Sequence, residues 1–121
     1  MKLTEDQIHA SIVQFWAVQA PDAIVHHSRN EGSRGGKAGI IDGARGKRMG
    51  VVKGYPDLII HWRGVTFFIE VKREGAYLDK AQKSLHEELR KHGLRVFVCR
   101  SVDDAREVYA EMKVAPRPAS V

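Results

Sequence analysis

The sequence contains a single cysteine, Cys99, among its 121 residues. One thiol excludes an internal disulfide framework and suits the reducing cytoplasm. The first residues lack the apolar core of a signal peptide, and no apolar run reaches the length of a membrane span. The Gly-Lys-Ser/Thr and Gly-x-Gly-x-x-Gly patterns that bind nucleotide phosphates are also absent, which argues against a nucleotide cofactor. We therefore expect a cytoplasmic protein without a membrane segment.

Zinc is disfavoured as well. His26 and His27 follow an apolar pair, Ile24 and Val25, in a segment that reads as a short strand. Neighbouring residues of a strand point to opposite faces, so the two imidazoles cannot both bind one ion from a regular strand. With one cysteine in the chain, a tetrahedral zinc site has too few ligands. We expect each histidine to be satisfied or exposed; the alternative for one of them is contact with DNA.

Length and charge indicate one globular domain with an anionic partner. A chain of 121 residues with 43% hydrophobic and 29% charged residues can form a core of its own. We assign residues 1–112 to a single domain and expect the Pro-containing end, 113–121, to be a disordered tail. The net charge of +5 favours a partner such as nucleic acid.

The positive charge is concentrated in residues 29–53. This segment carries seven basic residues against two acids, so its net charge of +5 equals that of the whole chain. Its seven glycines predict a flexible loop, with a short helix from Asp42 to Gly50. The loop is either simply solvated or becomes ordered on a phosphate backbone. Its candidate DNA-binding residues are Arg29, Arg34, Lys37, Arg45, Lys47, Arg48 and Lys53.

Patterning elsewhere predicts an α/β fold, with a mixed central β-sheet flanked by helices. The expected order is helix, strand, basic loop, hairpin, helix, strand, helix, because apolar residues recur at helical or alternating spacing between turn signals. Two capping boxes mark helix starts, Thr4 with Gln7 and Asp79 with Gln82. The predicted helices cover 4–19, 79–92 and a last segment to about 112 that either Ser101 or Asp103 caps. The predicted strands cover 23–27, 57–62, 65–72 and 94–99.

The hairpin has a register with chemical consequences. If Arg63 and Gly64 form a two-residue loop, counting back along both strands places Asp57 directly opposite Glu70. Directly opposed residues point to the same side with Cβ atoms roughly 4.5–5.5 Å apart, and like charges there destabilise a sheet. A divalent cation between the two carboxylates would turn that repulsion into a binding site, because hard cations prefer carboxylate oxygens.

Lys72 lies one step further along the same face and places a positively charged ammonium group beside the two acids. Taken alone, Glu70 and Lys72 would be read as a solvated strand face, and Asp57 as the start of a strand. Because all three residues occur together in apolar strands, a metal site is favoured, provided that no bulge shifts the register.

These residues resemble a known family. Gly54-x-Pro56-Asp57-Leu58, Glu70-x-Lys72 and Gly75-x-x-Leu78-x-x-x-Gln82 are similar to the motifs of the VRR-NUC nucleases. That family belongs to the superfamily marked by a Pro-Asp and a later Asp/Glu-x-Lys, with a restriction-endonuclease-like core. The resemblance runs from Glu5 to about Tyr109. It is strongest to the short standalone members of phages and bacteria, which implies a bacterial host cell as the location.

The resemblance implies Mg²⁺- or Mn²⁺-dependent hydrolysis of DNA phosphodiester bonds. It implies a homodimer that acts as an endonuclease on branched DNA such as Holliday junctions. The implied catalytic residues are Asp57, Glu70, Lys72 and Gln82. The implied metal ligands are Asp57, Glu70, the backbone carbonyl of Val71, and Glu5.

Several alternatives stay open at this stage. Glu5 either stabilises the positive end of its helix or reaches the metal. Gln82 either completes a capping box or faces the site, and Lys72 orients water, deprotonates it or stabilises the phosphate. The rivals to a nuclease are a non-catalytic DNA-binding module and a small partner-binding protein. The sequence does not choose between DNA and RNA or between one ion and two.

Overall fold

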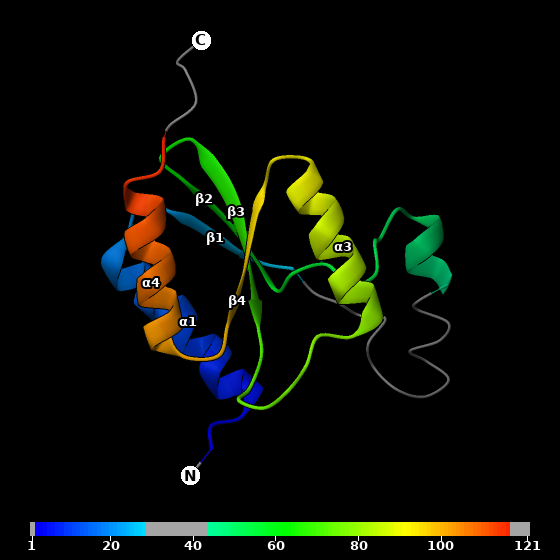
Figure 1. Cartoon of the computed structure of the whole chain (residues 1–121), viewed down its shortest axis with the longest axis horizontal. Helices are drawn as coiled ribbons and strands as arrows, with labels where there is room; N and C mark the ends of the chain where they lie inside the picture. The colour runs from blue at the N-terminus through cyan, green and yellow to red at the C-terminus, as the bar shows by residue number, and fades with distance from the viewer. Residues whose placement is uncertain (1, 29–43, 117–121) are drawn as a thin grey trace.

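The computed structural model describes residues 2–28 and 44–116, which form the elements seen in Figure 1. Their order reproduces the predicted one, and the helix and strand boundaries agree to within one or two residues. A separate helical turn covers 44–48. The elements are α1 (Glu5–Gln19), β1 (Ile24–His27), β2 (Leu58–Trp62), β3 (Val65–Val71), α3 (Lys80–Lys91), β4 (Arg95–Cys99) and α4 (Val102–Lys113).

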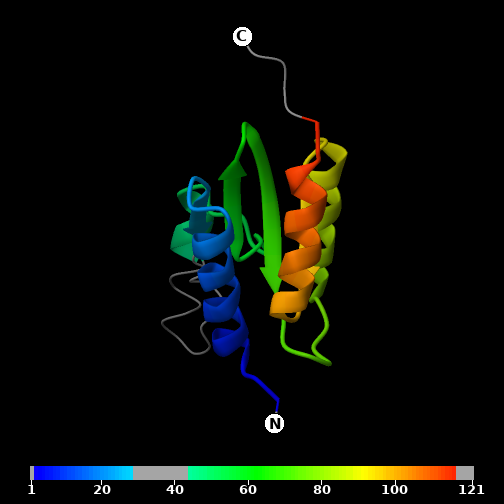
Figure 2. The same ribbon diagram turned by 90° about the vertical axis from the view of Figure 1, so that its left-hand side faces the viewer.

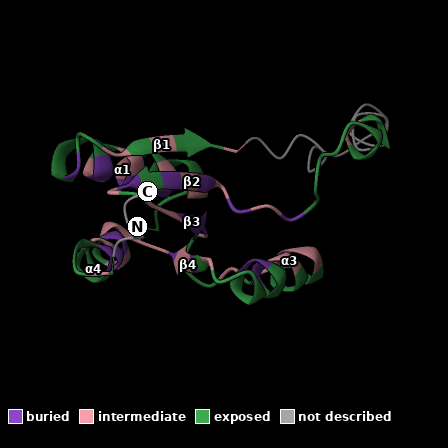
Figure 3. Cartoon of the chain, turned by 90° about the horizontal axis from the view of Figure 1, so that it is seen from above, coloured by how far each residue is buried: buried purple, intermediate pink, exposed green. Residues whose placement is uncertain are grey.

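The strands form one mixed sheet in the order β1-β2-β3-β4. β1 with β2 and β2 with β3 are antiparallel, whereas β3 and β4 are parallel. The parallel pair requires a crossover, and α3 supplies it. Seen from above, α1 and α4 cover one face of the sheet and α3 lies on the other (Figure 3). The predicted fold class is therefore confirmed.

Both predicted capping boxes are present. The Thr4 side chain accepts from the Gln7 backbone N–H at 3.1 Å, and the Gln7 side chain accepts from the Thr4 N–H at 2.9 Å. Asp79 and Gln82 do the same for α3 at 2.8 and 2.9 Å. Ser101 caps α4. Each cap satisfies orphan N–H groups at the start of a helix, so these residues fix where the helices begin.

The two faces of the sheet have separate apolar clusters, because side chains alternate along each strand. On one face α1 and α4 run in the same direction (Figure 2) and enclose Trp16, which is fully buried and makes ring contacts with Trp62, Phe67 and Tyr109. The cluster beneath α3 is smaller and centres on Phe68, Leu89 and Val96.

The hairpin turn sets the register of β2 and β3. Arg63 and Gly64 have φ values of 57° and 80°, and two consecutive positive φ angles are the signature of a type I′ turn. Trp62 therefore pairs with Val65, and the ladder continues to Leu58 opposite Ile69 without a bulge. This is the register predicted from the sequence.

The predicted basic loop lies only partly within the described residues. Arg29, Arg34 and Lys37 fall outside them, as does the predicted start of the short helix. The helical turn at 44–48 is followed by Gly50, whose φ of +90° suits a helix end.

The predicted domain end at residue 112 falls inside a helix. α4 continues to Lys113, and Ala115 still packs against the main core. Residues 117–121 of the predicted tail lie outside the described part of the chain. Among the residues described, no helix has both the length and the apolar character needed to cross a membrane.

Candidate active site

The β2–β3 register brings Asp57 and Glu70 together at one end of the sheet. Leu58 opposite Ile69 is the last paired position, so Asp57 and Glu70 occupy the next one. The Oδ2 atom of Asp57 accepts a hydrogen bond from the Val71 backbone N–H at 2.7 Å. The side chain of Asp57 therefore extends the ladder by one hydrogen bond beyond the backbone pairs, which fixes its carboxylate beside Glu70.

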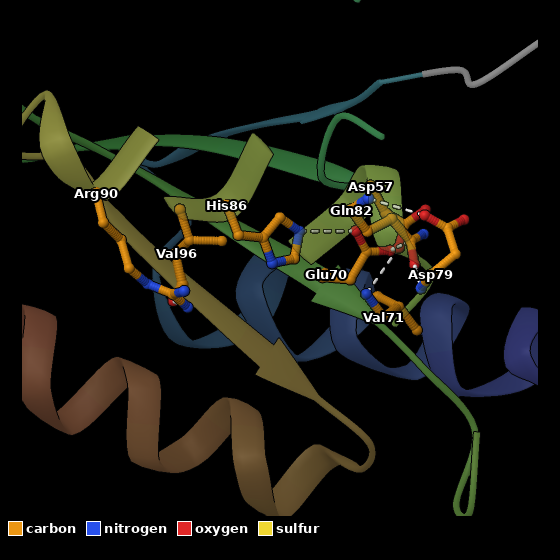
Figure 4. A network of polar contacts seen from close by, with 8 residues as sticks. All are labelled: Asp57, Glu70, Val71, Asp79, Gln82, His86, Arg90 and Val96. Carbon is orange, nitrogen blue, oxygen red and sulfur yellow. Dashed lines mark hydrogen bonds and ion pairs between the residues drawn. The ribbon is translucent and has the colours of Figure 1, made fainter. Parts of the chain in front are cut away.

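Glu70 is buried on the face covered by α3, with 1% of its surface exposed. Two side chains from α3, one helical turn apart, contact its two oxygens (Figure 4). Gln82 Nε2 donates to Oε2 over a long 3.5 Å, and His86 Nε2 lies 3.2 Å from Oε1. The same Gln82 amide therefore completes the helix cap and contacts Glu70, and its catalytic role stays a prediction.

Burial and a neighbouring acid raise the pKa of Glu70 to about 10. Desolvation is the main cause, followed by the hydrogen bond and then the negative charge of Asp57; the charge of Glu5 acts in the same direction, and that of Lys72 opposes it. At neutral pH the carboxyl therefore keeps a proton. Burial, and next to it the charge of Arg90, lowers the pKa of His86. The Glu70–His86 contact has the geometry of an ion pair but is a neutral hydrogen bond.

The side chains of Asp57 and Glu70 are suited to a hard divalent cation, because two facing carboxyl groups offer the oxygen ligands that Mg²⁺ and Mn²⁺ take. Within the described part of the chain, however, no group of three or more His, Cys, Asp or Glu side chains is assembled closely enough to hold a metal ion. The protein provides a pair of acids, and further ligands would come from the backbone, water or substrate.

The other predicted ligands are placed differently. Lys72, half-buried, directly follows β3, and its backbone N–H donates to the Cys99 carbonyl at 3.0 Å. Glu5 begins α1, which covers the opposite face of the sheet (Figure 3), and it acts on Glu70 through its charge. The structure thus brings Asp57, Glu70 and Gln82 together at the Val71 backbone, with Lys72 adjacent, but does not bring Glu5 into a three-acid cluster.

A glycine allows the loop before Asp57 to reach α3. Gly54 has a φ of +84°, and a Cβ atom there would lie 2.7 Å from the carbonyl of Ala81 and 2.9 Å from the Gln82 nitrogen. Real Cβ atoms do not approach backbone so closely, so only glycine permits this contact. The contact holds the loop that carries Pro56 and Asp57 against the first turn of α3.

The described basic residues of the predicted DNA-binding set are all exposed. Arg45, Lys47 and Arg48 lie on the helical turn at 44–48, and Lys53 follows it. Figures 1 and 3 show this turn and α3 on the side of the sheet opposite α1 and α4. That is also the side on which Glu70 lies.

Sequence reasoning missed His86. The available signal was its spacing, because a residue four positions after Gln82 lies on the same edge of a helix. Leu89 lies on the same edge and is buried too, yet His86 is the more deeply buried of the two.

A four-stranded mixed sheet flanked by helices, with facing acids and a lysine at one end, is the arrangement expected of a nuclease-type α/β domain. The VRR-NUC family model matches residues 4–103. A solved structure described as a "VRR_NUC domain protein" has 29% sequence identity and a TM-score of 0.75, covering 98% of this chain and 95% of that chain. A search of curated proteins gives no match. The chain belongs to the VRR-NUC family, as its motifs predicted.

Proposed function

We propose that this protein is a metal-dependent DNA endonuclease. The observation that carries the proposal is the pair of facing acids, in which Glu70 is 1% exposed and keeps a proton because burial, and then Asp57, raise its pKa. A binding module gains nothing from such a pair, whereas a hydrolase acting on phosphate esters gains a cation site at the scissile bond. Membership of a nuclease-type family supports the same conclusion.

In this proposal Asp57, Glu70 and the backbone carbonyl of Val71 hold Mg²⁺ or Mn²⁺, and Glu5 is a possible further ligand. When bound, the ion acidifies a water molecule and offsets the charge that develops on the phosphate. Asp57 is already fixed by the Val71 N–H at 2.7 Å, so it offers its remaining lone pairs without reorientation.

Lys72 and Gln82 act beside the ligands. Lys72 directly follows β3 and its charge acts on Glu70, so its three donors can orient the attacking water or a phosphate oxygen. Gln82 is anchored by its cap contact with Asp79, so its amide presents Nε2 to Glu70 in a fixed direction. We favour the orienting role for Lys72 over that of a general base.

The substrate in this proposal is duplex DNA with a branch, and the active species is a homodimer in the cytoplasm of a bacterial cell. Positive charge attracts phosphates, and the exposed basic turn at 44–48 stands on the same side of the sheet as Glu70. Symmetric cutting of a junction requires two active sites, which a chain of this size provides only as a dimer. Sedimentation of the protein with and without junction DNA tests the dimer.

A second candidate is a non-catalytic DNA-binding module with the same fold. The observation in its favour is that the described residues assemble no group of three ligands for a metal. Such a module would bind duplexes in EDTA, and replacing Asp57 with alanine would tighten binding by removing negative charge.

The test is cleavage of end-labelled linear, flap and four-way-junction DNA, and of a matched RNA duplex, with Mg²⁺, Mn²⁺ or EDTA. The comparison is between wild type, Lys72→Ala and the matched control Lys91→Ala, an exposed lysine near the far end of α3. We expect cutting only with metal, abolished by Lys72→Ala with DNA binding retained, and unchanged by Lys91→Ala. Metal-independent binding without cutting would replace the nuclease with the binding module, and neither cutting nor binding would leave a partner-binding protein.

A further inference from the structure

The mechanism above leaves one buried polar side chain on α3 without a role. His86 has no exposed surface, although histidine is a costly residue to bury. Its Nε2 atom lies 3.2 Å from Glu70 Oε1, on the oxygen that Gln82 does not contact. Figure 4 shows the imidazole directed along the sheet surface toward this carboxyl.

The other ring nitrogen shows where the imidazole proton resides. Nδ1 of His86 is buried and has no hydrogen-bond partner among the residues that the structure describes. If Nδ1 carried the proton, a buried N–H donor would be left without an acceptor, which is rare in folded proteins. With the proton on Nε2, the N–H donates to Glu70 and only a weak acceptor is left unpaired.

An Nε2–H donor is compatible with both states of the carboxyl. The oxygen that accepts from it can do so whether Glu70 is protonated, as in the metal-free protein, or ionised, as a metal ligand must be. Gln82 and His86 lie four residues apart on one edge of α3 and contact different oxygens. Together they fix both the position and the rotation of the carboxyl about its terminal bond.

We propose that His86 is a positioning residue for the metal site: its Nε2–H holds the Glu70 carboxyl beside Asp57, where the two acids would bind the cation. This inference rests on the proposed function and names a residue that the family motifs in this chain do not include. Groups that orient a metal ligand in this way typically contribute roughly 10- to 100-fold in metal affinity or activity.

Direct binding of Mn²⁺ to the DNA-free protein tests the proposal by calorimetry, without relying on catalysis. His86→Leu keeps an apolar side chain of similar bulk and removes the donor, whereas His86→Gln keeps an N–H donor. Leu89→Ala is the matched control, because it disturbs the same buried edge of α3 without touching Glu70. We expect the Kd for Mn²⁺ to rise roughly 10- to 100-fold in His86→Leu, to lie closer to wild type in His86→Gln, and to stay unchanged in Leu89→Ala.

Cleavage at saturating Mn²⁺ then separates positioning from a merely structural role. For His86→Leu we expect a lower kcat with an unchanged KM for DNA, since the side chain touches the ligand and not the substrate. Circular dichroism melting reports whether each variant folds. An equal Kd for Mn²⁺ in wild type and a folded His86→Leu would overturn the proposal, as would an equal loss in Leu89→Ala.

The wild-type protein supplies a readout that needs no variant. Nitrogen-15 spectra of the histidine rings distinguish the two tautomers, and we expect His86 to be protonated at Nε2 and to shift when Mg²⁺ is added. A ring protonated at Nδ1, or a signal indifferent to Mg²⁺, would contradict the proposal while leaving metal-dependent cleavage intact. Wild-type protein that neither binds Mn²⁺ nor cleaves DNA would instead remove the proposed function, and this inference with it.

Discussion

Replacing Glu70 with glutamine should make the metal-free protein more stable, and increasingly so as the pH rises. Burial and the facing Asp57 raise the pKa of Glu70 from an ordinary value of 4.5 to about 10. Between these two values the folded protein keeps a proton that the unfolded chain has lost, so raising the pH favours unfolding. Glutamine keeps the shape and some hydrogen bonds of the neutral acid but has no proton to lose.

The size of the effect follows from the linkage between proton binding and folding. One proton held only by the folded state changes the free energy of unfolding by about 1.4 kcal/mol per pH unit. From pH 6 to pH 8 the Glu70→Gln protein should therefore gain about 3 kcal/mol over wild type. That is a large fraction of the roughly 5–15 kcal/mol that stabilises a typical domain.

Urea unfolding in EDTA at pH 6, 7 and 8 measures this difference, with exposed Glu87→Gln as a control for the chemical change alone. Adding Mg²⁺ at pH 8 should stabilise wild type, by about 2.7 kcal/mol at a concentration 100 times the Kd, and should have a much smaller effect on Glu70→Gln. Parallel pH profiles for wild type and Glu70→Gln would refute the argument, because they would show that Glu70 ionises normally in the folded protein.

Three further outcomes are expected. Gly54→Ala should destabilise the protein by about 2 kcal/mol or more in urea unfolding, because its Cβ would meet the α3 backbone at 2.7 Å. Gly75 also has a positive φ but lies in open space, so Gly75→Ala should destabilise the protein by only about 1–2 kcal/mol. Burial raises the pKa of the Cys99 thiol to about 12, so native protein at pH 8 should resist a thiol reagent that reacts at once in urea; rapid native labelling would contradict this. Asp79→Ala should lower the free energy of unfolding by about 1 kcal/mol without changing Mn²⁺ affinity, whereas Gln82→Ala should lower both the free energy of unfolding and the Mn²⁺ affinity. Equal Mn²⁺ affinities in the two variants would show that the Gln82–Glu70 contact does not matter.

Much of the fold follows from local signals in the sequence. The capping boxes at Thr4 and Asp79 determined the starts of α1 and α3, because they satisfy specific backbone donors. The pairing of the hairpin strands followed from one dipeptide, Arg63 and Gly64, since a two-residue turn leaves only one register. That register alone places Asp57 opposite Glu70.

The sequence did not predict which elements, far apart along the chain, come into contact. His86 reads as a polar residue on a largely charged helix, and only the approach of α3 to the sheet makes it a partner of Glu70. Glu5 shows the same limit: the family resemblance implied a ligand, and in the structure Glu5 begins α1, which covers the other face of the sheet, while its charge still acts on Glu70. Helical spacing gives the edge on which a residue lies but not what that edge will face.

The metal-free protein would be more stable without an acid at position 70. On the same face of β3, Phe68 packs with Leu89 and Val96, and an apolar side chain at 70 would extend that cluster. The chain instead places a second acid, Asp57, beside Glu70, which costs stability in the metal-free protein, and holds Glu70 through contacts with Gln82 and His86, which orient its oxygens. A cation that binds there displaces the proton of Glu70 and uses the carboxylate as a ligand, which glutamine cannot supply. Metal affinity and metal-free stability should therefore change in opposite directions when the charge at position 70 is removed, and a variant that improved both would break the link between this site and its proposed chemistry.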